Sequence, residues 1–227
     1  MKESIKNLSF GKGLITLLLF VFAIDLSGQT EEKIPLPQFL FPKFIKGIVK
    51  MKAGNTYSAS INYNMVDEEM IFEQKGVYMV LDKPQLIDTV FIQNRCFVPF
   101  DKAFYEVVYK GPITFFIQHK AKYTQVPSTT AYGMKSPTNA TYAVKSVQGG
   151  NQIRHLDVPD NVTVSTSPLY WVRKNNEMEK FNGQRQFIKI FPEKEAELKS
   201  FISKENLNVK NREDLIKLGI YCNEILK

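Results

Sequence analysis

The central part of the chain alternates between hydrophobic and polar positions in short segments separated by turn residues. In residues 56–63, aromatic and aliphatic side chains alternate with serine and asparagine, and a period of two is typical of a half-buried β-strand. Other segments, such as residues 115–117, are hydrophobic at every position, as in a strand that is covered on both faces. This mixture predicts a mainly β (α+β) fold, in which an antiparallel meander forms a curved sheet, a half-barrel or a barrel.

The expected strands are rich in β-branched and aromatic residues and lie at residues 48–52, 56–63, 70–73, 77–81, 88–93, 96–100, 103–110, 113–123, 153–156, 162–165, 169–174, 178–181 and 186–191. Gly76 is expected to supply the left-handed position of one hairpin turn, and Asn94-Arg95 is expected to form another turn. The pattern therefore predicts mostly local, hairpin-like connections.

Two amphipathic helices are expected near the C-terminal end, over residues 193–205 and 212–226. Pro192 suits the first turn of a helix, where its missing N–H group would have no partner. Asn211 has the side chain of an N-cap, and Asp214 lies three residues further on, close to a capping-box arrangement. We expect these helices to close one end of the sheet rather than to form a separate domain.

Residues 1–28 have the three-part pattern of a secretory signal peptide, with early lysines, an apolar run at residues 14–24 and small residues at its end. An uncleaved signal anchor is the alternative, although the run is short for a membrane span. The first cysteine is Cys96, so a lipobox cysteine is not expected. The sequence predicts a periplasmic or secreted protein with no transmembrane span in the mature chain.

Two further segments differ from the strands in composition. Residues 29–45 contain several prolines, which keep a chain extended, so we expect a strap across the hydrophobic body; a proline-rich ligand for a partner is the alternative. Residues 125–152 are rich in Ser, Thr, Gly and Asn, and a polar loop of this length is commonly functional or mobile. Residues 46–227 as a whole are expected to form a single β-rich domain.

Composition narrows the class of protein. The 227 residues are 44% hydrophobic and 23% charged, as in a globular protein rather than a disordered chain. The formal net charge of +7 is compatible with nucleic acid, anionic lipid or acidic polysaccharide as a partner. Export argues against nucleic acid, and the lysines near the C-terminus alternate with acids, as on a solvated surface.

Few residues are available for catalysis or metal binding. The chain has two histidines, His119 and His155, and lacks the motifs of metal-binding helices, nucleophile elbows and phosphate loops. Acids at residues 67–69, Asp157 and Asp160 leave a glycosidase open, because two suitably spaced carboxylates can cleave a glycosidic bond. The sequence favours a protein without catalytic activity, and we expect no metal and no cofactor.

Cys96 and Cys222 each have hydrophobic neighbours, as a buried thiol does. In an exported protein they can instead form a disulfide that joins a helix to the sheet, provided that their Cα atoms lie within ~7 Å. Both alternatives follow from the sequence.

Aromatic residues give a stronger indication of function than the candidate catalytic residues do, because the chain contains 17 Phe, 10 Tyr and 1 Trp. Many are expected in the core of the sheet. Tyr132, Tyr142, Tyr170 and Trp171 lie in or near the polar loop, where aromatic and small polar side chains together form typical contact surfaces. We expect these four residues to contact a glycan, a lipid or another envelope protein, with tyrosines that fold back onto the core as the alternative.

Several segments resemble a group of exported proteins from Bacteroidota-type bacteria: Phe41-Pro-Lys-Phe44 leading to Gly47, Ile61-Asn-Tyr-Asn64, Met70-Ile-Phe72, Ala131-Tyr-Gly133, Ile190-Phe-Pro192 and the helix from Leu215 to Leu218. The resemblance lies in the order of these segments. It implies export and a single domain; the group has no assigned activity, so the resemblance implies no catalytic residues.

These expectations combine into an exported, non-catalytic accessory protein of the cell envelope that binds an unidentified ligand. The alternatives are a hydrolase that acts on envelope polysaccharide through its carboxylates, and a structural subunit that pairs through uncovered strands of its sheet.

Overall fold

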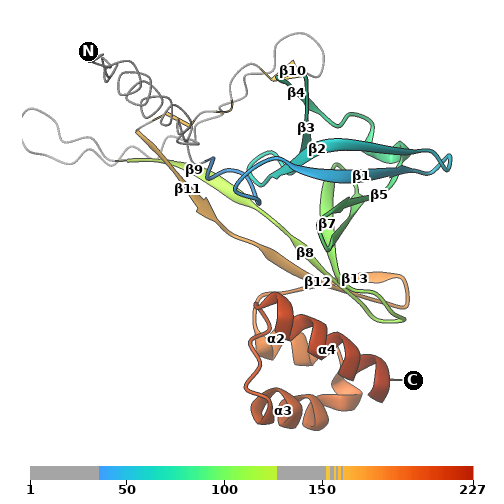
Figure 1. Ribbon diagram of the computed structural model, residues 1–227. Coiled ribbons are helices and arrows are strands. Elements are labelled where there is room, and N and C mark those ends of the chain that lie inside the picture. Colours follow the sequence, from blue (N-terminus) through green and yellow to red (C-terminus); the bar gives the residue numbers. More distant parts are fainter. Residues whose placement is uncertain (1–35, 127–151, 154–155, 157, 160, 227) are drawn as a thin grey trace, which may run out of the picture. The chain divides into compact units, whose positions relative to one another are not determined.

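The computed structural model describes residues 36–126, 152–153, 156, 158–159 and 161–226, which fall within a single compact unit (Figure 1). The proposed signal peptide and nearly all of the polar loop lie outside the described residues. None of the described helices is both long enough and apolar enough to span a membrane.

The strands are β1 (Ile45–Met51), β2 (Thr56–Asn64), β3 (Glu69–Gln74), β4 (Val77–Val80), β5 (Ile87–Ile92), β6 (Arg95–Phe100), β7 (Ala103–Tyr109), β8 (Thr114–Gln118), β9 (Ala121–Gln125), β10 (Gln152–Ile153), β11 (Val162–Thr166), β12 (Leu169–Lys174) and β13 (Glu177–Phe181). The helices are α2 (Gln184–Lys189), α3 (Glu195–Lys204) and α4 (Arg212–Ile225), with 3-10 turns at Pro84–Leu86 and Pro192–Lys194.

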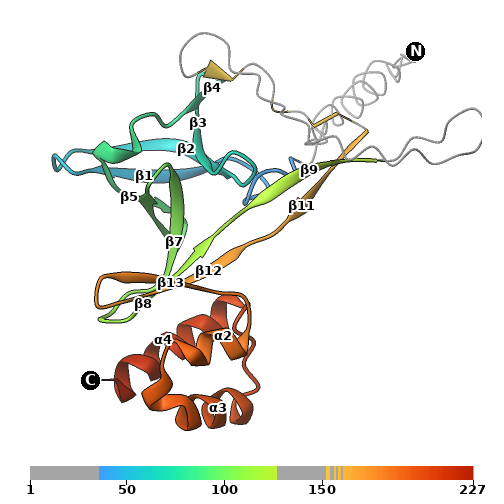
Figure 2. The same ribbon diagram turned by 180° about the vertical axis from the view of Figure 1, so that it is seen from behind.

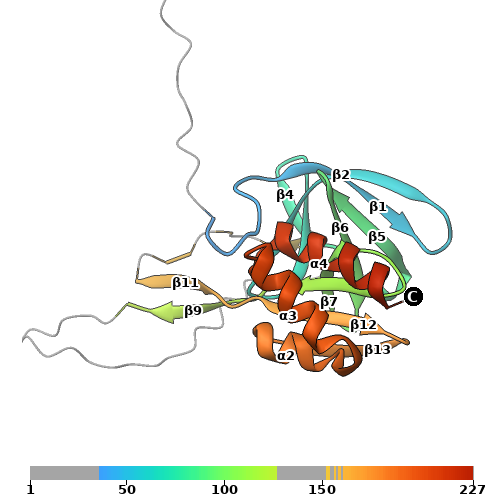
Figure 3. The ribbon, with the colours of Figure 1, turned by 90° about the horizontal axis from the view of Figure 1, so that it is seen from below.

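Eleven of the strands form one antiparallel sheet in the order β10-β4-β3-β2-β1-β5-β6-β7-β8-β12-β13. The sheet is curved, and its end strands β10 and β13 do not pair with each other (Figure 3). The predicted antiparallel, mainly β fold with C-terminal helices is therefore confirmed, in its open form rather than as a closed barrel.

Two-residue turns with positive φ connect several of the strands. Lys75 and Gly76 have φ values of 54° and 79°, and Asn175 and Asn176 have 53° and 65°. Successive left-handed residues match the twist of an antiparallel hairpin, which explains the glycine and the asparagines. The second predicted turn is shifted by one residue, because Ile92 pairs with Arg95.

The single strand expected at residues 113–123 is two strands. β9 and β11 form a separate two-stranded sheet that continues the direction of β8 and β12 (Figure 2). The ladder is interrupted at His119-Lys120, opposite Pro168, which has no N–H group to donate to a neighbouring strand. The Ser167 N–H donates to the Lys120 carbonyl across this interruption at 2.7 Å.

The prediction of a strand at residues 186–191 is wrong, because these residues form most of α2 and the turn after it. Phe187, Ile190 and Phe191 recur at helical spacing, and all three side chains are buried together. A short hydrophobic run fits either period, and packing on the strands selects the helix here. α3 and α4 lie within the predicted ranges, and Asn211 caps α4 by accepting hydrogen bonds from the Glu213 and Asp214 N–H groups.

One face of the sheet, called the inner face below, carries two hydrophobic clusters. The sheet cluster comprises Phe41, Val49, Ile61, Tyr63, Met65, Met70, Ile87, Val90, Ile92, Phe97 and Phe104. The helix cluster joins β7, β8, β12 and β13 to the helices and comprises Val108, Ile113, Phe115, Ile117, Tyr170, Val172, Phe181, Phe187, Ile188, Ile190, Phe191, Leu198, Ile202, Leu207, Val209, Leu215, Leu218 and Cys222. Both clusters are filled by large side chains, several of them completely buried.

Helix α4 contacts β7 and β8 through two specific features. The Asn223 amide accepts from the Ile113 N–H and donates to the Ile113 carbonyl, each at 2.9 Å. A Cβ atom at Gly219 would lie 2.5 Å from Cγ of Tyr109, so only glycine allows this close approach of helix and ring.

The described part of the proline-containing segment lies against β2. Phe39 and Phe41 are each 5% exposed. The Asn62 amide donates to the carbonyls of Phe41 and Lys43 and accepts from the Phe41 N–H. These bonds satisfy backbone groups of a segment that has no strand partner along most of its length.

Candidate functional site

The face opposite both clusters, called the outer face, carries an apolar row that runs across the strands. Cross-strand pairing places these side chains side by side in the order Ile48, Phe91, Cys96, Val107, Phe116 and Trp171. Adjacent partners in an antiparallel ladder have Cβ atoms about 5 Å apart, so the row is continuous over six strands. It forms because hydrophobic residues occupy both faces of these strands, as the sequence pattern indicated.

A groove with a volume of about 520 Å³ lies over the middle of this row, from Phe91 to Phe116. Its lining comprises Lys50, Asp88, Thr89, Phe91, Cys96, Val98, Pro99, Phe100, Tyr105, Val107, Lys110, Thr114, Phe116, Arg173 and Met178. We call it the outer groove. Its volume falls within the range of about 300–1,000 Å³ that is usual for ligand sites.

The outer groove has cations on both sides of the apolar row, because the strand register places Lys50 on one side and Lys110 and Arg173 on the other. Lys50, Lys110 and Arg173 are exposed, and none of them forms an ion pair with another described residue. The Arg173 guanidinium lies 5.3 Å from the centre of the Phe116 ring, a cation–π distance that holds it over the groove floor. The single acid of the lining, Asp88, accepts a hydrogen bond from the Thr89 hydroxyl at 2.9 Å.

Aromatic rings lie at one end of the outer groove, with Phe100 and Tyr105 on the same side of the apolar row as Lys50. The Phe100 and Tyr105 rings are 5.1 Å apart, and the Tyr105 and Trp171 rings are stacked at 5.9 Å. The Trp171 indole N–H donates to Gln118 Oε1 at 3.2 Å, which fixes the orientation of the ring. Burial raises the pKa of Tyr105, so its phenol remains a neutral hydrogen-bonding group at physiological pH.

The four aromatic residues predicted to contact a partner lie in different parts of the protein. Trp171 borders the outer groove through its stacking on Tyr105. Tyr170 is only 5% exposed, packs in the helix cluster and donates its hydroxyl to the Lys210 carbonyl at 2.9 Å, so it is a core residue rather than a contact residue. Tyr132 and Tyr142 lie outside the described residues.

The alternative of a disulfide between Cys96 and Cys222 does not hold in this structure, where both thiols are free. The physical reason is their placement on opposite faces of the sheet. Cys222 is completely buried in the helix cluster, and burial raises its pKa to about 12. Cys96 is partly exposed in the floor of the outer groove.

A buried ionic cluster, the Glu106 cluster, lies on the inner face. The Glu106 side chain is completely buried, and its carboxylate accepts hydrogen bonds from Arg95 of β6, from His119 and from Arg212, the first residue of α4. The Arg212 Nε and His119 Nε2 atoms lie 2.6 Å and 2.7 Å from its oxygens, and Arg95 Nε lies at 2.8 Å. The cluster therefore links the helical region directly to the middle of the sheet.

The ionisation of this cluster follows from burial and pairing. Burial alone raises the pKa of Glu106, but the hydrogen bonds from His119, Arg95 and Arg212 outweigh it and lower the pKa to about 2. Burial lowers the pKa of His119, an effect that the hydrogen bond to Glu106 partly offsets. The carboxylate is ionised and saturated with donors, so the cluster is a structural junction rather than a general base with a free lone pair.

The sequence singled out His119 but not the rest of the cluster. Glu106 stands between Phe104 and Val108 at positions that share one strand face, and a lone acid on an apolar face is the signal that could have identified it. The two arginines come from distant segments and carry no comparable signal.

The acids that suggested a glycosidase are engaged elsewhere where the structure describes them. Glu68 pairs with Lys120 at 2.6 Å, and Asp67 accepts a hydrogen bond from the Asn64 amide at 3.0 Å. Asp157, Asp160 and His155 lie outside the described residues. Among the residues that are described, no group of three or more His, Cys, Asp or Glu side chains is arranged to hold a metal ion.

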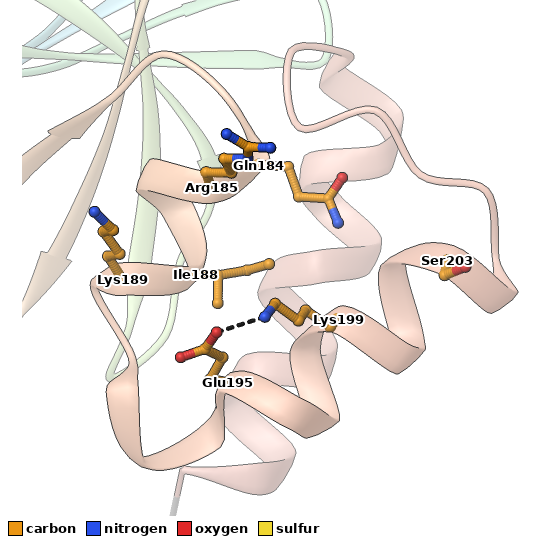
Figure 4. Close-up of a pocket in the computed structure, with 7 residues that line it drawn as sticks. All are labelled: Gln184, Arg185, Ile188, Lys189, Glu195, Lys199 and Ser203. Carbon is orange, nitrogen blue, oxygen red and sulfur yellow. Dashed lines mark ion pairs between the residues drawn. The ribbon is translucent and has the colours of Figure 1, made fainter.

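A second groove, of about 580 Å³, lies between α2 and α3 (Figure 4). It contains Arg185, Lys189 and Lys199, and Lys199 pairs with Glu195 at 2.6 Å. Among the described residues, its lining includes one hydrophobic side chain, Ile188, and no aromatic ring. It therefore matches the outer groove in the number of cations but lacks an apolar floor.

Comparison with protein-family models, with curated proteins and with solved structures finds no match to this chain.

Proposed function

We propose that this chain is a non-catalytic binding protein and that the outer groove is its ligand site. The observation that carries the proposal is the apolar row on the open face of the sheet, bordered by cations that form no ion pair with any residue that the structure describes. An apolar floor with a few polar groups at its margin is the usual composition of a ligand site.

The filled inner face supports a site on the outside of the sheet. The sheet cluster and the helix cluster are both closely packed, with aromatic pairs such as Tyr63–Phe97 and Phe181–Phe187 at centroid distances of 6.0 Å and 5.2 Å. A ligand between the sheet and the helices would have to displace these side chains. The outer groove requires no such rearrangement.

The setting of the proposed function is the cell envelope. The leader-like pattern of residues 1–28 and the resemblance to exported proteins of Bacteroidota-type bacteria both support a periplasmic or secreted location. There the protein would serve as an accessory binder of an envelope component.

Native mass spectrometry of the protein isolated from its own host tests this proposal. We expect a reproducible extra mass on the wild-type protein. The Cys96→Trp variant fills the groove floor and should lose this mass, whereas the control Ile220→Trp, at an exposed position of α4, should retain it. Equal retention by both variants, or no extra mass on the wild type, would contradict the proposal.

A further inference from the structure

We infer that the outer groove binds an acidic polysaccharide, a sugar chain with repeated carboxylates, that lies across the strands along the apolar row. This inference rests on the proposed function and deepens it by naming the class of ligand. It follows from the spacing of the cations, from the state of the backbone beneath the groove and from the aromatic rings that line it.

The cations are spread over the groove rather than clustered. Lys50 lies on β1, Lys110 directly follows β7, and Arg173 lies on β12. With strands about 4.8 Å apart, Lys50 and Lys110 are separated by about 14 Å across the strands, in addition to their offset along the strands, and Arg173 lies about 10 Å beyond Lys110. A single anionic headgroup would be served by cations that converge on one point, whereas cations spaced in this way match a chain with repeated negative charges.

The charge balance of the groove favours an anion. The lining contains three cations and one acid, and that acid is already hydrogen-bonded to Thr89. Arg173 offers a planar guanidinium that suits a carboxylate, and the two lysines act as mobile point charges. Each contact is exposed to solvent, so the attraction weakens as salt increases.

The backbone beneath the groove argues for a sugar chain and against an acidic peptide. Strands β5, β6, β7 and β8 each have a ladder partner on both sides, so their N–H and C=O groups are already paired. A peptide bound there would find no strand edge to extend, and edge pairing is the usual source of affinity for extended peptides. A sugar chain needs no such edge, because its hydroxyl groups can remain in water.

The aromatic rings and the apolar floor complement the other surface of a sugar. The C–H face of a pyranose ring is apolar and packs on aromatic rings such as Phe100 and on floor residues such as Val107. The neutral hydroxyl of Tyr105 can donate to or accept from a sugar hydroxyl. A chain with carboxylates along its length and ring faces beneath therefore matches the spaced cations and the apolar floor together.

Binding to an oligogalacturonate tests the inference. Its fully methyl-esterified form is the uncharged control, and poly-L-glutamate is the control for an acidic peptide. We expect the wild-type protein to bind the oligogalacturonate, and to bind the methyl ester about tenfold more weakly, a difference of about 1.4 kcal/mol. Poly-L-glutamate that bound as tightly as the sugar would overturn the assignment to a polysaccharide.

Two charge variants locate the interaction. A triple substitution in the outer groove, Lys50→Gln, Lys110→Gln and Arg173→Gln, should weaken oligogalacturonate binding about tenfold. The matched control removes the same charge from the groove between α2 and α3 through Arg185→Gln, Lys189→Gln and Lys199→Gln (Figure 4), and it should bind as the wild type does. An equal loss in both variants would show attraction to net charge alone and would overturn the inference.

Labelling of Cys96 with a maleimide separates this inference from the proposed function. The oligogalacturonate should slow the labelling of Cys96, which lies in the groove floor. If only the methyl ester protects Cys96, the groove is a binding site but the inference of an acidic ligand is wrong. If neither protects Cys96 and the Cys96→Trp variant keeps its host-derived mass, the proposed function itself is wrong.

Discussion

Glu106 shows how one residue can fix the relation between distant parts of the chain. Its carboxylate receives donors from β6, from the interruption after β8 and from the start of α4. Because Glu106 is completely buried, each donor that it loses leaves a charge with poor access to water. The hydrophobic pattern of β7 predicts a buried position here but does not indicate which side chains would satisfy the acid.

Replacing Glu106 with glutamine should lower the free energy of unfolding by about 3 kcal/mol, because removal of one partner of a buried ion pair leaves the others uncompensated. Chemical denaturation monitored by circular dichroism would measure the change. The control Glu193→Gln removes an exposed pair with Lys174 and should leave the free energy of unfolding almost unchanged, because exposed ion pairs contribute little. Equal effects of the two substitutions would contradict the structural role of Glu106.

Stability should fall as the pH is lowered, in two stages. His119 has a lowered pKa in the folded protein, so below its ordinary value of 6.5 the unfolded chain binds more protons and is favoured. The lowered pKa of Glu106 adds a second loss as the pH falls from 4.5 towards about 2. Thermal melts across this range would reveal both stages, and His119→Gln should reduce the first; an unchanged profile in this variant would refute the assignment.

Among the elements, α4 depends on a close approach to β7. Gly219→Ala should lower the free energy of unfolding by about 1–2 kcal/mol, because the clash with Tyr109 exceeds the gain in helix propensity. Ile220→Ala, at the adjacent exposed position, is the control and should have little effect. Denaturant titration of both variants checks this prediction, which fails if Gly219→Ala proves stabilising.

The outcome for individual elements shows which signals the sequence carries. Gly76 and Asn211 act through local backbone geometry, so the hairpin turn and the helix cap were predicted from single positions. α2 was predicted as a strand because a short apolar run fits either period, and only its packing in the helix cluster distinguishes them. The division of β8 from β9 lies opposite Pro168, which stands between β11 and β12 and is remote in sequence, so no local pattern reveals it.

At the scale of the whole molecule, the sheet separates a packed inner face from an open outer face. The sequence predicted the curved antiparallel sheet and identified Trp171 beside the groove. It could not predict the apolar row, because Phe91, Val107 and Phe116 become neighbours only through the register of non-adjacent segments. The separation of Cys96 from Cys222 has the same origin, since it depends on which face each thiol occupies.

The two thiols offer the most direct test of whether the outer groove is the ligand site. Protein isolated from its host should be labelled with a maleimide before and after its ligand is removed by washing in concentrated salt. Cys96 should react several-fold faster after the wash, whereas Cys222, which is completely buried, should remain unlabelled in both samples until the protein unfolds. An unchanged rate at Cys96, with a ligand demonstrably released, would contradict binding in the outer groove.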